Sequence, residues 1–395
     1  MHILYASNLY PPAIGGSQIH LHCLAKHVKR AGNQVSVITL TSRYRNDWLR
    51  LSTILTDQEK HYSYEDVPVT QIGFPWDVRV RLLPWAAAYY AWMGLATKRI
   101  SRRMLPYFEK LAPPPSIVHV TRNGREFLAQ AALDYARSHG VPLVLTPNHH
   151  PRWKGFLYRE WDRIYREADA LMALTEAEKD TLVNEKGACE ERVHVTGVGP
   201  VLCERSCPEA FRARFNISRR FILFLGQQHR YKGVDAVLES TFFVWRQHPD
   251  VMYVFIGPQT THSSRVFRGW PQDDRVVNLG EVDLETKTSA LAACEFLCVP
   301  SAQESFGGVY VEAWSLRKAV IGGRIPPIAS LITHGRDGLL CSQDPSELAA
   351  MICCLLSHPE TCRSMGDAGH QKVQENYTWD HIARKTLAVY RTLCS

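Results

Sequence analysis

Residues 295–313 read EFLCVPSAQESFGGVYVEA. The apolar run EFLCVP is typical of a buried strand, and the small polar turn, paired glycines and helix-like run after it are typical of a strand that feeds a helix. The first amides of a helix lack internal hydrogen-bond partners and lie at the positive end of its dipole, so they favour an anion. Two carboxylates, Glu304 and Glu312, flank the glycines and indicate a ligand with hydroxyl groups as well as charge.

The same alternation of strand-like and helix-like segments continues on both sides of this stretch. It starts at residues 2–8, is interrupted by a proline- and charge-rich passage at 199–220, and restarts at 221–227. Repeated strand-helix-strand units predict parallel sheets covered on both faces, so we expect an α/β protein with two doubly wound domains and a linker near residue 200. Ligands of such sheets bind at the carboxyl ends of the strands, where the loops converge on a cleft.

The composition is that of a soluble globular chain. Of 395 residues, 45% are hydrophobic and 22% are charged, which is ordinary for about two or three soluble domains. The amino-terminal sequence is typical of a buried strand rather than a signal peptide, so we expect a cytoplasmic protein. Eleven cysteines are scattered without a C-x-x-C pair at metal spacing, which favours reduced structural thiols over a zinc site.

The formal net charge of +7 is modest and forms no long basic tail. It suits an anionic small molecule or a membrane surface, and we expect no nucleic-acid partner. Residues 78–107 combine an apolar, aromatic segment of about fifteen residues, too short to span a bilayer, with basic residues on both sides. This segment has two interpretations, a core helix with a solvated basic end or a peripheral membrane contact.

Four short constellations lie at predicted strand ends. In 301–313, a helix that begins near Gly307 would place Glu304 at its mouth and Glu312 more than a turn inside, so the two acids can reach different hydroxyl groups of one elongated ligand. The loop GQQHRYKGV, 226–234, offers basic side chains that could neutralise a diphosphate, although a basic loop is often only solvated.

The other two constellations are weaker. PPAIGGSQIHLH, 11–22, places two glycines before a predicted helix, where backbone amides could approach a phosphate, although turn glycines are common. TPNHHPRW, 146–153, places two histidines in a loop, where they could supply a base or serve a structural role.

These motifs resemble those of the retaining, GT-B-fold glycosyltransferases of family 4. GQQHRYKG is similar to the G-R-x-x-x-x-K-G loop of that family, and ESFGGVYVE matches its E-x-F-G-x-x-x-x-E motif. The likeness extends through 169–182, 192–200 and 334–340 to the carboxyl terminus. It implies two Rossmann-like domains that face each other across a cleft: an acceptor domain at 1–199, a donor domain at 200–376, and a last helix at 377–395 that crosses back to the first.

The resemblance implies a nucleoside-diphosphate sugar as donor and no further cofactor. By matching position, Glu304 would bind sugar hydroxyls, Glu312 the two ribose hydroxyls, and Lys232 the diphosphate of the leaving group. The backbone positions that would contact the donor are Gly15 and Gly16 in the first domain and Phe306, Gly307 and Gly308 in the second.

The sequence departs from the family pattern at two positions. Gln227 stands where the family has an arginine in the diphosphate site, and we expect Arg230 to take its place beside the donor. Asn148 stands where the family often has a histidine, and we expect His150 to serve instead. The predicted catalytic set is therefore Lys232, Glu304, Arg230 and His150, with Gln227 among the donor-binding residues.

The resemblance implies a retaining hexosyltransferase whose acceptor is a lipid-linked sugar, a polysaccharide or a small-molecule glycan precursor. The sequence contains no Asp-x-Asp pair, so we expect no metal ion. Two alternatives stay open: a catalytically impaired sugar-binding or scaffold protein of the same fold, which the departures at Gln227 and Asn148 allow, and a nucleotide-sugar epimerase, which shares only the architecture.

Overall fold

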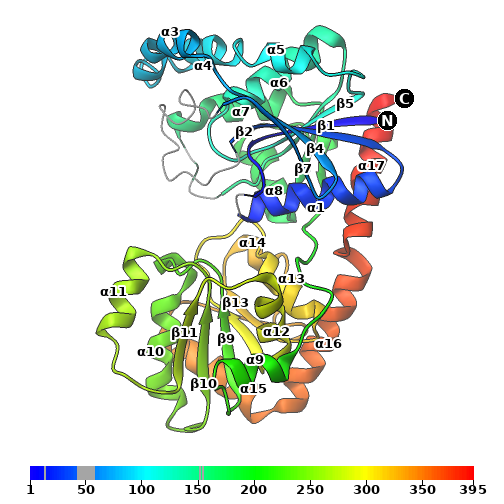
Figure 1. Cartoon of the computed structure of the whole chain (residues 1–395). Coiled ribbons are helices and arrows are strands. Elements are labelled where there is room, and N and C mark those ends of the chain that lie inside the picture. Colours follow the sequence, from blue (N-terminus) through cyan, green and yellow to red (C-terminus); the bar gives the residue numbers. More distant parts are fainter. Residues whose placement is uncertain (13–14, 42–57, 151–152, 154) are drawn as a thin grey trace. The chain divides into compact units, whose positions relative to one another are not determined.

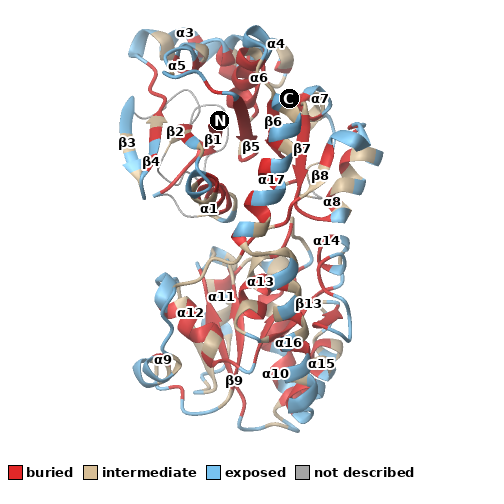
Figure 2. Cartoon of the chain, turned by 90° about the vertical axis from the view of Figure 1, so that its right-hand side faces the viewer, coloured by how far each residue is buried: buried red, intermediate tan, exposed pale blue. Residues whose placement is uncertain are grey.

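The computed structural model describes residues 1–12, 15–41, 58–150, 153 and 155–395. The chain forms two compact units, one of residues Met1–Gly197 together with Trp379–Ser395 and one of residues Val198–Thr378. Each unit is a parallel β-sheet with helices on its faces (Figure 1), which confirms the prediction of two Rossmann-like α/β domains. In both units the central strands are largely buried and the outer faces of the helices are exposed (Figure 2).

The first unit has, within the described residues, an eight-stranded sheet in the order β3-β4-β2-β1-β5-β6-β7-β8. The pairs are parallel except for the antiparallel pair at the β3–β4 edge. Helices cover both faces of the central strands, which is why these strands consist of nearly continuous apolar runs. The strands are β1 (His2–Leu9), β2 (Gln34–Thr41), β3 (Lys60–Tyr64), β4 (Val67–Gln71), β5 (Ile117–Thr121), β6 (Leu143–Thr146), β7 (Ala170–Ala173) and β8 (Val193–Val195).

The helices of the first unit include the last helix of the chain. That helix, α17, packs against α1, and the Tyr390 side chain hydrogen-bonds to the ring of His119 on β5. The helices are α1 (Gly16–Arg30), α3 (Trp76–Ala87), α4 (Met93–Ser101), α5 (Leu105–Glu109), α6 (Phe127–His139), α7 (Arg159–Glu167), α8 (Glu176–Asp180) and α17 (Trp379–Cys394).

Residues 78–107, interpreted from the sequence as a core helix or a peripheral membrane contact, are divided among α3, α4 and α5 rather than forming one helix. The chain turns between Ala88 and Trp92, and the turn carries the buried Tyr89, whose hydroxyl donates to the carboxylate of Glu126. A hydrogen bond to a buried carboxylate outweighs the helical preference of the surrounding alanines, which cannot be read from local sequence.

The second unit has a six-stranded parallel sheet in the order β11-β10-β9-β12-β13-β14. In order of appearance this is 3-2-1-4-5-6, the dinucleotide-binding topology whose ligands lie where the strand order reverses, here between β9 and β12. The strands are β9 (Phe221–Leu225), β10 (Met252–Ile256), β11 (Val276–Gly280), β12 (Phe296–Val299), β13 (Ala319–Gly323) and β14 (Leu339–Cys341).

The helices of this unit are α9 (Pro208–Arg214), α10 (Val234–Val244), α11 (Thr261–Gly269), α12 (Leu284–Ala293), α13 (Gly308–Ser315), α14 (Pro326–Ala329), α15 (Pro345–Ser357) and α16 (Pro359–Asn376). Five of them, α10 to α14, connect successive strands, as a parallel sheet requires, whereas α9 precedes β9 and α15 and α16 follow β14. Among the helices that the structure describes in either unit, none combines the length and the apolar character needed to cross a bilayer.

Candidate functional site

Two predicted catalytic residues meet at the switch point of the second unit. Lys232 ends the short 3-10 turn Arg230–Lys232 after β9, and Glu304 lies in the loop after β12. The Lys232 ammonium donates a hydrogen bond to the Glu304 carboxylate, and both side chains are mostly buried. The fold therefore brings together two oppositely charged side chains that are 72 residues apart in the sequence.

Hydrogen bonds to backbone carbonyls hold these two loops against each other. The amide of Ala302 donates to the carbonyl of Tyr231 at 2.7 Å. The side-chain amide of Gln343 donates to the carbonyls of Tyr231 and Pro300 at 2.9 and 2.8 Å. Three strand ends, those of β9, β12 and β14, are thus fixed around the Lys232–Glu304 pair.

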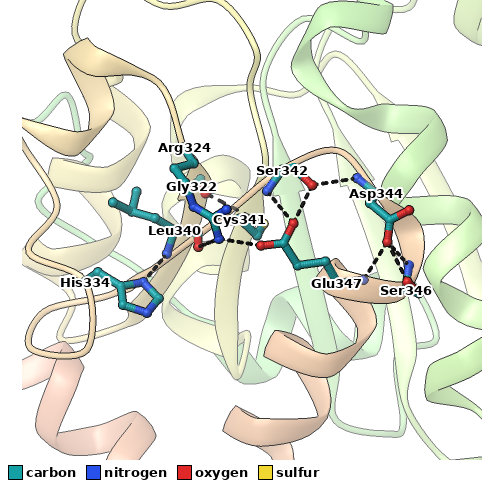
Figure 3. Close-up of polar contacts among 9 residues, drawn as sticks. All are labelled: Gly322, Arg324, His334, Leu340, Cys341, Ser342, Asp344, Ser346 and Glu347. Carbon is teal, nitrogen blue, oxygen red and sulfur yellow. Dashed lines mark hydrogen bonds and ion pairs between the residues drawn. The ribbon is translucent and has the colours of Figure 1, made fainter.

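A polar network supports the segment that carries Gln343 (Figure 3). Glu347, in the first turn of α15, accepts from the backbone and hydroxyl of Ser342 and pairs with Arg324. These contacts hold the pKa of the Glu347 carboxyl below its usual range, because they favour the charged form. Asp344 caps α15 by accepting from the amides of Ser346 and Glu347. The network fixes the Gln343 backbone between two anchored residues.

The amino terminus of α13 lies directly after Glu304. Its cap residue Gly307 has φ +90°, and a Cβ there would lie 2.6 Å from the ring of Tyr310, so the position requires glycine. A Cβ on Gly308 would meet open space, while the Phe306 side chain is buried against Tyr377. No side chain in the described part of the chain caps α13, so its first amides could bind an anion.

Glu312 lies inside α13 and is paired with a residue that the sequence analysis missed. Lys287, on α12, donates to Glu312 Oε1 at 2.8 Å and to the carbonyl of Val201 at 2.7 Å. Both side chains are largely buried, so the lysine compensates the acid in a site where an isolated charge would be costly. No local pattern predicts this contact, because Lys287 belongs to no motif.

Arg230 and Gln227 are both exposed on the loop after β9. The Arg230 side chain is 84% exposed, and its Nε lies 3.8 Å from Oδ2 of Asp235, which also hydrogen-bonds to His262 at 2.9 Å. In this arrangement Arg230 faces a carboxylate, so its contact with a diphosphate stays a prediction. The neighbouring Gln228, in contrast, is fully buried and hydrogen-bonds to Asn278 at 2.8 Å.

The paired glycines of the first unit lie at the start of α1, whereas residues 13–14 of the same motif lie outside the described residues. Gly15 is the cap residue and Gly16 the first helical residue. A Cβ on Gly16 would meet open space, and one on Gly15 would lie 2.2 Å from the side-chain oxygen of the buried Gln18. As at α13, no described side chain caps this helix, so its first amides could bind an anion.

A buried arginine, also missed by the sequence analysis, organises the loop that carries His150. Arg122 follows β5 and is 2% exposed. Its guanidinium carbon lies 4.1 Å from the ring centroid of Trp153 and 4.8 Å from that of Trp161, while Nη1 donates to the hydroxyl of Tyr165. Cation–π contacts of this kind replace part of the lost hydration of a buried cation. Arg122 thus ties the histidine loop to α7.

The histidine loop itself is fixed by its backbone. Asn148 adopts φ +45° and its side chain donates to the carbonyl of Arg122 at 3.3 Å. The amide of His149 donates to Glu178, which is 4% exposed and also accepts from the amide of Leu174 at 2.6 Å. Burial raises the pKa of the Glu178 carboxyl to about 7, against the opposing effects of these two amides.

His150 is part of the same loop, and its carbonyl accepts from the amide of Trp153 at 2.8 Å. Residues 151–152 and 154 of this motif lie outside the described residues. The structure places His150 next to the Arg122 cluster, and its predicted catalytic role stays a prediction. Among the described residues, no group of three or more histidine, cysteine, aspartate or glutamate side chains is placed to hold a metal ion.

Comparison with protein families matches both units. Residues 15–199 match the model described as "Glycosyl transferase 4-like domain", and residues 219–358 match "Glycosyl transferases group 1". The chain is 28% identical over 289 residues to the alpha-maltose-1-phosphate synthase of Mycolicibacterium smegmatis, covering 64% of this chain and 73% of that protein. It is 23% identical over 412 residues to a glycogen synthase of Mycobacterium tuberculosis, covering 99% of this chain and 94% of that protein.

Solved structures share the fold. The crystal structure of Anabaena HepE in complex with UDP-glucose superposes with a TM-score of 0.76 at 15% identity, covering 99% of this chain and all of the other. At this identity the likeness establishes the two-domain architecture of both proteins and leaves the ligand of this chain to be argued from its own residues.

Proposed function

Because the chain belongs to the glycosyltransferases of group 1 and adopts the GT-B fold, we propose that it is a retaining, metal-independent hexosyltransferase. It moves a sugar from a nucleoside-diphosphate sugar to an acceptor hydroxyl. The observation that carries this proposal is the contact between Lys232 and Glu304 beside the uncapped amino terminus of α13. A cation and free helix amides suit a diphosphate, and an adjacent carboxylate suits sugar hydroxyls.

The donor extends along the loops at the switch point of the second unit. Its diphosphate lies between Lys232 and the first amides of α13, and its sugar hydroxyls donate to Glu304. Its ribose hydroxyls donate to Glu312, whose second carboxylate oxygen is available because Lys287 contacts Oε1. The complex of HepE with UDP-glucose supports a donor of this class.

The chemistry is a front-side displacement at the anomeric carbon. A bond forms between the acceptor oxygen and that carbon while the bond to the diphosphate oxygen breaks, and the leaving phosphate accepts the proton of the acceptor hydroxyl. Lys232 and the α13 amides stabilise the negative charge that grows on the diphosphate. Glu304 orients the sugar, so the protein acts mainly through positioning and electrostatics.

The acceptor is a glycan precursor or a lipid-linked sugar. The His150 loop, which Arg122 and Glu178 hold in place, is the part of the first unit that we assign to the acceptor hydroxyl. A neutral histidine ring has one donor and one acceptor nitrogen, so it can hydrogen-bond to a hydroxyl.

The test is a thermal-shift screen of UDP-, GDP- and ADP-sugars with the wild type and Lys232→Ala. A donor that binds the folded state raises the melting temperature by mass action, and the shift should be smaller in the variant. The stabilising donor is then incubated with and without candidate acceptors, and the anomeric configuration of the product is read by NMR. Transfer should survive EDTA. A product of inverted configuration, or activity that EDTA abolishes and magnesium or manganese restores, would contradict the proposal.

A further inference from the structure

Exposed apolar side chains are concentrated in one short part of the first unit. Of the eleven large hydrophobic residues that are exposed within the described parts of the chain, five lie between residues 76 and 95. Trp76 is 73% exposed and Trp92 is 61% exposed, although tryptophan is usually largely buried. The five residues are Trp76, Val80, Leu83, Trp92 and Leu95.

This exposure does not result from loosely packed helices. On α3, Leu82 and Ala86 are buried in the core, and on α4 the residues Met93, Ala96 and Ile100 are buried in the same core. Trp76, Val80 and Leu83 follow the helical spacing of four and three residues, so they share one exposed, outer face of α3, separate from the inner face of Leu82 and Ala86. Helix α3 therefore has apolar residues on its inner and its outer face, and only the inner face is covered within the described residues.

Basic residues surround this outer face. Residues 76–107 contain six lysines and arginines and one acid, a net charge of +5, against +7 for the whole chain. The acid, Asp77, lies 3.5 Å from Arg81. Four of the basic side chains are exposed around the end of α4, namely Lys98, Arg99, Arg102 and Arg103. In Figures 1 and 2, α3 and α4 lie at the same end of the first unit.

We propose that the outer faces of α3 and α4 are a docking surface for an anionic lipid bilayer. Tryptophan and aliphatic side chains enter the boundary between headgroups and acyl chains, while lysine and arginine bind the anionic headgroups. A bilayer matches both features, because it presents negative charge and an apolar layer together. The inference goes beyond the proposed function, since bilayer binding can be measured without donor or acceptor.

The experiment is co-sedimentation with vesicles of phosphatidylcholine alone or with 30% phosphatidylglycerol, across a salt series. The wild type should bind the anionic vesicles at low salt and be released as salt screens the contact. The charge variant changes Lys98, Arg99, Arg102 and Arg103 to Gln, and its control changes four exposed arginines of the second unit, Arg246, Arg265, Arg268 and Arg336, to Gln. The charge variant should lose at least about tenfold in partitioning, and its control should stay within about twofold of the wild type.

The apolar part of the surface has its own variant. Trp76→Ser with Trp92→Ser should also lower partitioning at least about tenfold, whereas Phe243→Ser with Leu284→Ser, which changes two exposed apolar residues of the second unit, should not. Brominated acyl chains should quench tryptophan fluorescence in the wild type more than in Trp76→Phe with Trp92→Phe. Circular dichroism and thermal melting confirm that each variant is folded.

Three results would overturn the proposal. The first is absence of wild-type binding to anionic vesicles, and the second is equal binding by the wild type and the charge variant. The third is a concentration-dependent dimer that the Trp76→Ser and Trp92→Ser changes abolish, with no loss of vesicle binding, because the surface would then serve a second copy of the chain. Each result is independent of whether a nucleoside-diphosphate sugar binds, so it does not affect the proposed function.

Discussion

The charged clusters around the predicted site residues hold their buried charges in different ways in the two units. In the second unit the charges are paired, Lys232 with Glu304 and Lys287 with Glu312. In the first unit, Arg122 lies among aromatic rings and Glu178 accepts from backbone amides, and within the described residues neither side chain makes an ion pair. A charged ligand can replace one member of an ion pair as the partner of the other. A cation among aromatic rings and an acid bound by backbone amides mainly fix the loop that carries His150. Substitutions in the two clusters should therefore have different effects.

The largest effect should follow Lys232→Ala. This change removes the cation from the diphosphate and leaves Glu304 as an unpaired buried carboxylate that repels the donor. We expect turnover to fall about a thousandfold, roughly 4 kcal/mol of transition-state stabilisation, and donor affinity to fall as well. Steady-state kinetics and donor titration measure both quantities. Wild-type donor affinity in a folded variant would show that the diphosphate lies elsewhere.

Glu304→Gln should lower turnover by about a hundredfold, roughly 3 kcal/mol, because a neutral amide orients the sugar hydroxyls less well. Donor affinity should change less than in Lys232→Ala, since the amide leaves the cation in place. The double variant measures the coupling of the pair, and non-additive losses are expected for side chains in contact. Strictly additive losses, or wild-type turnover in Glu304→Gln, would contradict a shared site.

In the first unit, Arg122→Ala should reduce stability rather than donor binding. It removes the cation–π contacts and leaves a cavity between the rings of Trp153 and Trp161, for which we expect a loss of about 2–4 kcal/mol in the free energy of unfolding. Denaturant titration at 25 °C measures this loss. The rise in melting temperature on donor binding should persist in the variant. Arg122→Lys keeps the charge and should restore only part of the stability, because lysine cannot stack as a planar guanidinium does. If Arg122→Ala is as stable as the wild type, the contacts of Arg122 with the aromatic rings do not stabilise the first unit.

The same contrast explains what could be predicted from the sequence. The alternation of strands and helices and the segment from Glu304 to Glu312 could be predicted, because their residues follow one another in local patterns. The aromatic cluster around Arg122 could not be predicted, because the rings of Trp153 and Trp161 approach Arg122 only in the folded chain. Lys287 was missed for the same reason, and the turn that separates α3 from α4 depends on a tertiary hydrogen bond to Glu126.

Glu178→Gln tests the first cluster through pH. The pKa of the carboxyl is raised from 4.5 to about 7 by burial, so the folded state binds a proton more tightly than the unfolded state. The resulting stabilisation is complete below about pH 4.5 and is lost as the pH rises towards 7. Relative to the variant, the wild type should lose up to about 3 kcal/mol in the free energy of unfolding across this window. Denaturant titrations at several pH values give the difference. A difference that is flat across the window would mean that the amides of His149 and Leu174 keep the carboxylate ionised.

The smallest effect should follow Lys287→Met, which tests the second of the two ion pairs. Methionine keeps most of the length of the lysine but removes the contacts with Glu312 and with the carbonyl of Val201. Glu312 then becomes a stronger acceptor for ribose hydroxyls but a less well-oriented one, and the two effects partly cancel. We expect the KM for the donor to rise about three- to tenfold, roughly 1 kcal/mol, with kcat nearly unchanged, because the ribose lies away from the reacting bond.

The matched control, Lys318→Met, removes a half-buried lysine that donates to the carbonyl of Cys294 at 2.8 Å, and it should leave the KM for the donor unchanged. If Lys287→Met instead lowers kcat as strongly as Glu304→Gln does, the lysine acts on the transition state, and the division of roles between the two ion pairs is wrong.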